Sequence, residues 1–131
     1  MAESCTGGLL SSRIVATPGS GDWFKGALVA YHSEIKFRLL GLPEGPVITD
    51  EASILMATGV RMLLDTDIGV AITGVAGPEP EEDQAVGTVF VGVASANGAH
   101  SLRLSLSGDP DEVRRDAAER AFDQLEQARK Q

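Results

Sequence analysis

The chain has 131 residues, a formal net charge of −8 and a single cysteine. That length suits one domain, which can bury about two thirds of its unfolded surface without disulfide or metal staples. One cysteine cannot form an internal disulfide, and no apolar run approaches the ~18 residues of a membrane span, so we expect a cytoplasmic protein. The negative charge argues against nucleic acids and anionic membranes as partners, because both attract positively charged surfaces.

The first predicted elements are a helix and a short strand. Apolar residues at helical spacing predict a helix over the run LLSSRIVA, which begins at Leu9. The turn cluster TPGSG follows, and the apolar run GALVAY, residues 26–31, has the length of a strand. Ser33 is the predicted N-cap of the next helix, EIKFRLL, which Gly41 would end.

A longer helix and a buried strand come next. Thr49 is the predicted N-cap, and Asp50 and Glu51 occupy the first turn, where the helix dipole favours acids. The apolar positions of this helix are interpreted as core: Leu55, Met56, Val60, Met62, Leu63 and Leu64. The continuous apolar run IGVAIT, residues 68–73, is typical of a strand that is buried on both faces.

The longest irregular segment is residues 74–87, GVAGPEPEEDQAVG. Loops at the ends of buried strands in α/β sheets are where ligands bind, and Gly74 and Gly77 would allow close backbone approach. Four acids would repel a phosphate: Glu79, Glu81, Glu82 and Asp83. A solvated acidic excursion explains the second half of the segment equally well.

The last third predicts a β-hairpin followed by a helix. The turn Asn97-Gly98 supplies positive φ angles between TVFVGVAS and AHSLRLSL, whose alternating leucines predict a strand at the sheet edge. Asp109, Pro110 and Glu112 then give an N-cap, a first helical position and a capping-box partner. The predicted buried stripe of this helix comprises Val113, Ala117, Ala121, Leu125 and Ala128.

This element order predicts the fold class. It is α/β, a single three-layer domain over residues 1–131 with a mixed sheet. The first three strands would be parallel and the last two would form an antiparallel hairpin at one edge.

The stretch AESCTGG, residues 2–8, concentrates chemistry before the first helix. Ser4, Cys5 and Thr6 can attack or form hydrogen bonds, and two glycines after them allow close backbone approach. A helix N-terminus there would offer free N–H donors to a developing oxyanion. Capping is the commoner use of serine and threonine at such a place, so both roles stay open on residue type alone.

With AESCTGG, YHSEIK, ITGVAGP, AVGTV and SGDPDEVRRDA in that order, the chain resembles the CinA C-terminal domain family of nicotinamide-nucleotide amidases over essentially its whole length. The resemblance implies a hydrolase that converts nicotinamide mononucleotide, a small pyridine nucleotide, into nicotinate mononucleotide and ammonia. It implies neither a metal nor a cofactor.

The resemblance also implies a catalytic trio. Ser4 would be the nucleophile, and Tyr31 and Lys36 would take and return its proton. Taken singly, a half-buried strand aromatic and a solvated helix charge are the commoner roles for Tyr31 and Lys36. A lysine base must be neutral, so its pKa has to fall from about 10.4 to about 7 or 8, which requires burial beside the serine.

A substrate-binding set completes the expected site. We expect backbone N–H groups around Thr6, Gly7 and Gly8 to form the oxyanion hole. By family analogy, the remaining binding residues are Ser33, Thr73, Gly74, Ala76 and Gly77.

Four departures from the family pattern bear on these expectations. The family has a helix and the start of a strand ahead of AESCTGG, so we expect a stub of a first strand here and either self-association, as a homo-oligomer, or an upstream segment. The loop PEPEEDQAVG loses two glycines and a lysine, and Pro110 replaces an arginine, which would weaken binding of a phosphate. Ser33 stands where the family usually has asparagine.

Three alternatives remain at this stage. Cys5 could be the nucleophile with His32 as base, although adjacent residues on a turn usually point apart. The chain could be a catalytically impaired nucleotide-binding or interaction domain. A reductase-type Ser/Tyr/Lys trio is disfavoured, because that chemistry needs Tyr and Lys four apart on one helix and a dinucleotide glycine fingerprint.

Overall fold

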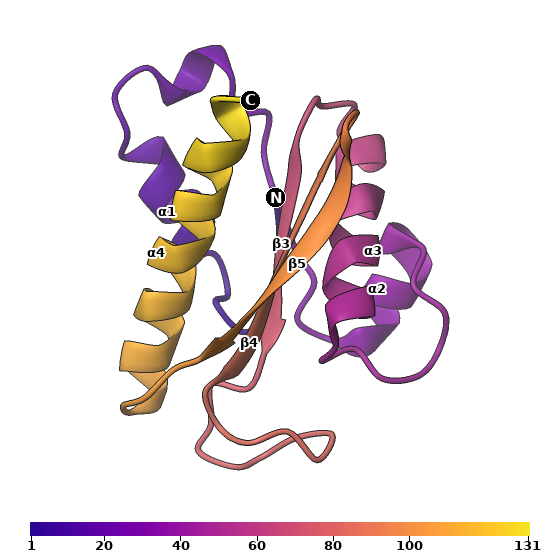
Figure 1. Ribbon diagram of the computed structural model, residues 1–131, viewed down its shortest axis with the longest axis vertical. Helices are drawn as coiled ribbons and strands as arrows, with labels where there is room; N and C mark the ends of the chain where they lie inside the picture. Colours follow the sequence, from indigo (N-terminus) through magenta and orange to yellow (C-terminus); the bar gives the residue numbers. More distant parts are fainter.

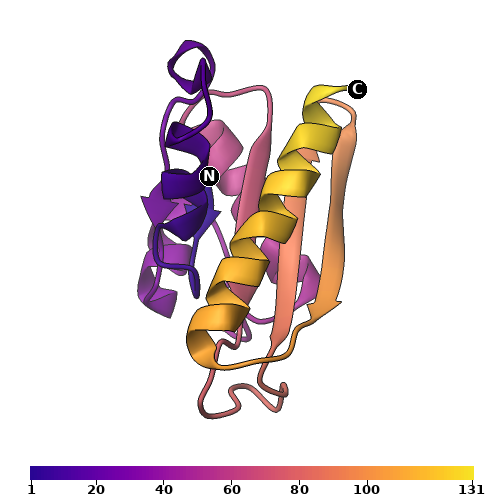
Figure 2. The ribbon, with the colours of Figure 1, turned by 90° about the vertical axis from the view of Figure 1, so that its left-hand side faces the viewer.

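A five-stranded mixed sheet with strand order β2-β1-β3-β4-β5 forms the centre of the computed structural model, which describes residues 1–131 (Figure 1). Its elements are β1 (Ala2–Glu3), α1 (Leu9–Val15), the 3₁₀ helix η1 (Ser20–Asp22), β2 (Leu28–Val29), α2 (Ser33–Leu40), α3 (Asp50–Leu63), β3 (Gly69–Gly74), β4 (Thr88–Ser95), β5 (Gly98–Ser105) and α4 (Pro110–Arg129). Helices α1 and α4 cover one face of the sheet and α2 and α3 the other (Figures 1 and 2). The predicted α/β class with three layers is therefore confirmed.

Strand directions follow the expected pattern. β1 pairs in parallel with β2 on one side, Ala2 opposite Leu28, and with β3 on the other, Ala2 opposite Ala71. β3 and β4 are antiparallel, as are β4 and β5, and β5 is an edge strand. The parallel first three strands and the antiparallel edge hairpin were both predictable, since βαβ connections favour the first and a tight turn the second.

The buried apolar residues divide into one cluster on each face of the sheet. Successive residues of a strand point to opposite faces, so Val70 and Ile72 join the cluster beneath α1 and α4, whereas Ala71 joins the one beneath α2 and α3. The first cluster holds most of the predicted stripe of α4, namely Val113, Ala117, Ala121 and Leu125, together with Phe122. These clusters hold the strand ends, and thus the loops that follow them, in fixed positions.

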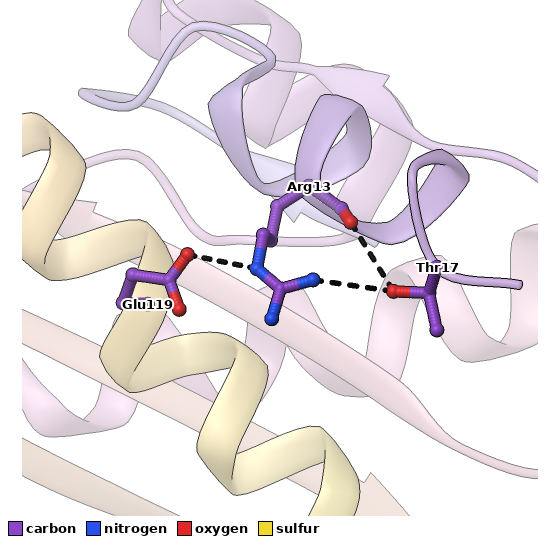
Figure 3. Close-up of polar contacts among 3 residues, drawn as sticks. All are labelled: Arg13, Thr17 and Glu119. Carbon is purple, nitrogen blue, oxygen red and sulfur yellow. Dashed lines mark hydrogen bonds and ion pairs between the residues drawn. The ribbon is translucent and has the colours of Figure 1, made fainter.

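A polar contact adds to the packing of α1 on α4. The Arg13 Nε donates to Glu119 Oε1 across 2.8 Å, and Arg13 Nη1 donates to Thr17 Oγ1 across 3.2 Å (Figure 3). The same guanidinium lies 4.0 Å from the centroid of the Phe122 ring. One side chain thus links the first helix to the last, at positions far apart in the sequence.

Several local predictions are confirmed and others are wrong. Thr49 caps α3, the capping box of Asp109 and Glu112 begins α4, and Gly41 ends α2 with a φ of 75°. Met62 and Leu63 are not core, at 73% and 49% exposed. Six residues at 100° each place Met62 about 120° around α3 from buried Met56, outside the buried face. None of the helices combines the length and the hydropathy that crossing a bilayer requires.

The cap of α2 and the second strand also differ from expectation. His32, not Ser33, is the N-cap, and its Nδ1 accepts a hydrogen bond from Glu34 N across 3.1 Å. The strand expected over residues 26–31 reduces to Leu28–Val29, because its only ladder partner, β1, is itself two residues long.

Candidate active site

The largest pocket described, about 570 Å³, lies where β1, β2 and β3 end, and Ser4, Tyr31 and Lys36 all contribute to its wall. Because β1 and β2 are parallel, with Glu3 opposite Val29, the residues that follow both strands meet at the same edge of the sheet. Ser4 follows β1 directly, Tyr31 follows β2, and Lys36 lies in the first half of α2. The three residues predicted as catalytic therefore share one cavity.

Ser4 is buried in a tight turn between β1 and α1. Its N–H donates to the carbonyl oxygen of Ile72 on β3 across 3.1 Å, and its own carbonyl oxygen accepts from Gly7 N across 3.0 Å. Gly7 adopts a φ of 59°, a left-handed conformation that suits glycine. The backbone of Ser4 is thus fixed on both sides.

Lys36 is the most buried charged group of the pocket, with only 1% of the residue exposed. Its Nζ donates to the main-chain carbonyl oxygen of Tyr31 across 3.1 Å. Desolvation is the largest cause that lowers the pKa of Lys36 from 10.5, while Cys5, Glu82 and Glu81 act in the opposite direction. Burial provides the direction of shift that a lysine base requires.

Tyr31 contacts the lysine through its main chain alone. The residue is 75% exposed, and its phenol makes no hydrogen bond within the chain. Of the charged residues in the pocket wall, Lys36 is thus the one that is buried as Ser4 is, whereas the Tyr31 ring lies at the surface. A role for the Tyr31 phenol in proton transfer stays a prediction.

The expected oxyanion hole needs a correction. Gly7 N donates to the Ser4 carbonyl oxygen and Gly8 N donates to Glu3 Oε1 across 3.2 Å, so neither is free for a substrate. Thr6 lies outside the pocket, and its hydroxyl donates to Glu3 Oε1 across 2.6 Å. The N–H groups of Cys5 and Thr6 donate to no other residue, and Cys5 contributes to the pocket wall.

The remaining predicted binding residues lie in the pocket wall, but Thr73 already has a partner. Its hydroxyl donates to the carbonyl oxygen of Val47 across 2.7 Å. The others contribute to the wall without such a bond: Ser33, Gly74, Ala76 and Gly77. Whether any of them binds a substrate remains a prediction.

The acidic loop after β3, residues 74–87, is only partly a solvent-exposed loop without contacts to the rest of the chain. Glu82 Oε1 accepts from the N–H groups of Val47 and Ile48 at 3.0 and 2.9 Å, and Gln84 donates to the Ile48 carbonyl oxygen across 3.4 Å. Glu82 and Gln84 therefore tie this loop to the segment before α3. Glu79 and Glu81 are exposed and contribute to the pocket wall.

Two residues of the site were missed from the sequence. Arg114 reaches the pocket from α4 and forms an ion pair with Asp111. No pattern distinguished it from Arg115, because the rotation of α4 depends on how Val113 packs. The second is Glu3, whose carboxylate accepts hydrogen bonds from the N–H groups of Gly8, Leu10 and Ser11 at the start of α1.

The structure disfavours Cys5 as nucleophile. Burial raises the pKa of its thiol to about 11, so the thiol remains protonated at neutral pH. The imidazole considered as its base, His32, is engaged as the N-cap of α2. The adjacent hydroxyl of Ser4 is left as the candidate nucleophile.

Fold and site together define a mixed α/β domain with a serine and a buried lysine at the carboxyl edge of its sheet, and comparison with known proteins agrees with this class. The family model for the CinA C-terminal domain matches residues 1–129. The chain belongs to this family, as its sequence motifs indicated.

Individual relatives give the same result. A CinA-like protein of Dictyoglomus thermophilum is 43% identical over 122 residues, which cover 87% of this chain and 29% of that protein. A CinA-like protein of Frankia casuarinae is 40% identical over 128 residues, which cover 94% of this chain and 30% of that protein. The chain thus spans under a third of the length of these relatives.

Solved structures share the whole fold. A competence or damage-inducible protein from Enterobacter asburiae superposes with a TM-score of 0.91 at 31% identity, covering 97% of this chain and 84% of that one. A competence-damaged protein (CinA) superfamily protein from Enterobacter cloacae gives a TM-score of 0.90 at 32% identity, covering 95% and 77%.

Proposed function

We propose that this domain is a metal-independent amidohydrolase that deamidates nicotinamide mononucleotide to nicotinate mononucleotide and ammonia. The observation that carries the proposal is the amine of Lys36, buried in the same pocket as Ser4. A desolvated amine beside a serine hydroxyl is a known way to activate a nucleophile without histidine. The family resemblance supplies the substrate, and the geometry supports the reaction type.

The chemistry begins with neutral Lys36 accepting the Ser4 hydroxyl proton as Oγ attacks the carboxamide carbon. The oxygen of the tetrahedral intermediate is stabilised by the N–H of Cys5, the residue after the nucleophile, which contributes to the pocket wall. Collapse expels ammonia, which takes the proton from Lys36, and leaves an acyl ester on Ser4. Water then hydrolyses the ester, again with Lys36 as base, and returns the carboxylate product and free serine.

The decisive experiment measures ammonia released from nicotinamide mononucleotide by the purified chain and by four variants. Ser4→Ala and Lys36→Met should each lower kcat by about 1,000-fold or more, since both belong to one catalytic unit. Ser12→Ala on α1 and Lys130→Met, both at exposed positions, serve as matched controls, and each should keep most of the activity. Equal activity in Ser4→Ala would remove Ser4 from the role of nucleophile.

A second candidate is a nucleotide-binding domain without turnover. The carboxylates of Glu79 and Glu81 at the pocket favour the lack of turnover, because their repulsion of the phosphate would displace a bound nucleotide from its reactive position beside Ser4. Calorimetry with nicotinamide mononucleotide would then detect binding while no ammonia appears. Burial of Lys36 favours the hydrolase, since a binding site for an anion would keep its lysine solvated and charged.

We also propose that the domain associates with itself. Val29 and Tyr31 are exposed apolar residues on the edge strand β2 and just after it. A second copy covering this edge would bring the Tyr31 phenol out of water. Light scattering of the chain and of a Val29→Lys variant tests the association, which the lysine should weaken.

A further inference from the structure

We infer that Glu3 is a positioning residue for Ser4, a role that rests on the proposed hydrolase function. Glu3 is fully buried, at 0% exposed, and immediately precedes the candidate nucleophile in the chain. It does not contribute to the pocket wall, so it acts on the substrate only through the turn that it holds.

Five donors converge on the two oxygens of the Glu3 carboxylate. Oε1 accepts from Thr6 Oγ1 at 2.6 Å, from Gly8 N at 3.2 Å and from Leu10 N at 2.9 Å. Oε2 accepts from Ser11 N at 2.9 Å and from the Ser11 hydroxyl. Every partner donates, which is the pattern that a carboxylate satisfies and that an amide cannot.

The main chain of Glu3 is fixed as firmly as its side chain. Its carbonyl oxygen accepts from Ala30 N across 2.7 Å, and in the sheet it lies opposite Val29 on β2 and Ile72 on β3. Glu3 therefore connects the turn that carries Ser4 to the central strand and to the segment that leads into Tyr31. The side chain of Glu3 holds the turn that carries Ser4, and its main chain holds that turn against the neighbouring strands.

Glu3 also decides which donors remain for the substrate. An unoccupied helix N-terminus would attract an anion, but the first turn of α1 already holds this carboxylate through Leu10 and Ser11. Of the turn, Cys5 and Thr6 keep N–H groups that donate to no other residue. Their direction depends on the bonds that Glu3 makes to Thr6 and Gly8 on the far side of the turn.

The Glu3→Gln variant tests this role with little change of shape. Its amide NH₂ must replace one of the two oxygens, and on either side it then faces a backbone N–H, which forces the turn to shift. We expect kcat for nicotinamide mononucleotide to fall about 10- to 100-fold, since a misplacement near 1 Å can cost that much. KM should stay within about twofold, because most residues of the pocket wall lie outside this turn.

Two further variants separate positioning from loss of stability. Glu3→Asp keeps the charge but is one methylene shorter, so it should recover part of the kcat lost by Glu3→Gln. Ser53→Ala removes a buried hydroxyl that bonds to Ser101 and to the Asp50 carbonyl oxygen, on the other side of the sheet. It should lower the Tm comparably and leave kcat unchanged.

A further measurement does not depend on enzymatic activity. NMR follows the backbone amide signals of Cys5 and Thr6 in the wild type and in Glu3→Gln. We expect both signals to shift, with faster hydrogen exchange at Leu10 and Ser11. Unchanged Cys5 and Thr6 signals, or a kcat within about twofold of the wild type, would overturn the inference. If the wild type releases no ammonia, the proposed function fails, while the amide signals still decide whether Glu3 sets the geometry of the turn.

Discussion

The Nζ of Lys36 donates a hydrogen bond to the main-chain carbonyl oxygen of Tyr31 across 3.1 Å. This bond joins α2 to the end of β2 and holds the amine in a pocket wall where only 1% of the residue is exposed. A charged amine with one neutral partner is poorly compensated for its lost hydration. The protonation of Lys36 is therefore coupled to folding and, in the proposed mechanism, to turnover, and both couplings can be measured.

Stability should rise with pH through the titration of Lys36. Its pKa is lowered from 10.5 in the folded chain, so between the two pKa values the unfolded chain binds more protons than the folded chain. The free energy of unfolding therefore increases with pH up to about 10.5, and Lys36→Met removes this contribution. Urea titrations at several pH values check it, with exposed Lys130→Met as control; the same slope in Lys36→Met and wild type would contradict it.

The loop carboxylates should shift the pH dependence of turnover. Glu81 raises the pKa of Lys36 through its charge, opposing desolvation. In Glu81→Gln the lysine should lose its proton at lower pH, so the alkaline rise of kcat/KM should begin at lower pH than in the wild type. Glu44→Gln, whose carboxyl lies outside the pocket, is the matched control. A profile displaced toward higher pH would refute the electrostatic assignment.

Arg114 should distinguish substrates with and without a phosphate. It is the one arginine in the pocket wall, whereas neighbouring Arg115 is exposed and does not contribute to the wall. We expect Arg114→Met to raise KM for nicotinamide mononucleotide about 10-fold, as loss of a charged hydrogen bond of about 1.5 kcal/mol implies, and to change KM for the riboside little. The control is Arg115→Met, and steady-state kinetics of the two variants with the nucleotide and the riboside measure the KM values. Equal effects of Arg114→Met and Arg115→Met would show that Arg114 makes no such contact.

Close contact between α3 and β4 makes Gly92 intolerant of a side chain. A Cβ at Gly92 would lie 2.0 Å from the carbonyl oxygen of Ser53 on α3, which is main chain and cannot move aside alone. We expect Gly92→Ala to lower the free energy of unfolding by more than about 2 kcal/mol. Gly21→Ala, with no heavy atom within 4 Å of its Cβ, should change it by less than about 1 kcal/mol. Chemical denaturation compares the two, and a Gly92→Ala variant as stable as Gly21→Ala would contradict the packing.

Local sequence rules predicted the elements whose signals are local. The cap at Thr49 and the capping box from Asp109 each depend on a few adjacent residues, and both are confirmed. The hairpin is confirmed too, but its two turn residues are Ala96 and Asn97, and the expected positive φ is found at Gly98 and not at Asn97. The prediction for Met62 was wrong for a physical reason. An apolar residue of a helix is buried only if its angular position around the helix axis falls within the buried face, and that of Met62 in α3 does not.

The site was predictable where topology alone brings residues together and not where side-chain partners decide. Parallel β1 and β2 bring Ser4 and Tyr31 to one edge whatever their side chains do. In contrast, the engagement of Gly8 by Glu3, and of Val47 by Glu82, depends on contacts between segments that no spacing in the sequence reveals. For this reason the sequence did not show that Gly8, expected among the oxyanion donors, is already engaged.

The Arg13 contact with Glu119 spans 106 positions along the chain and fastens the helix behind the Ser4 turn to the final helix. β1 likewise needs β3 before it can take its place inside the sheet. Contacts between residues so far apart in the sequence form slowly, because the entropy of closing the loop between them is lost before the contact gains any free energy. The segment carrying Ser4, the proposed nucleophile, is thus among the earliest of this domain to leave a ribosome and among the last to become ordered, so in a partly synthesised domain Ser4 is not yet held in its site.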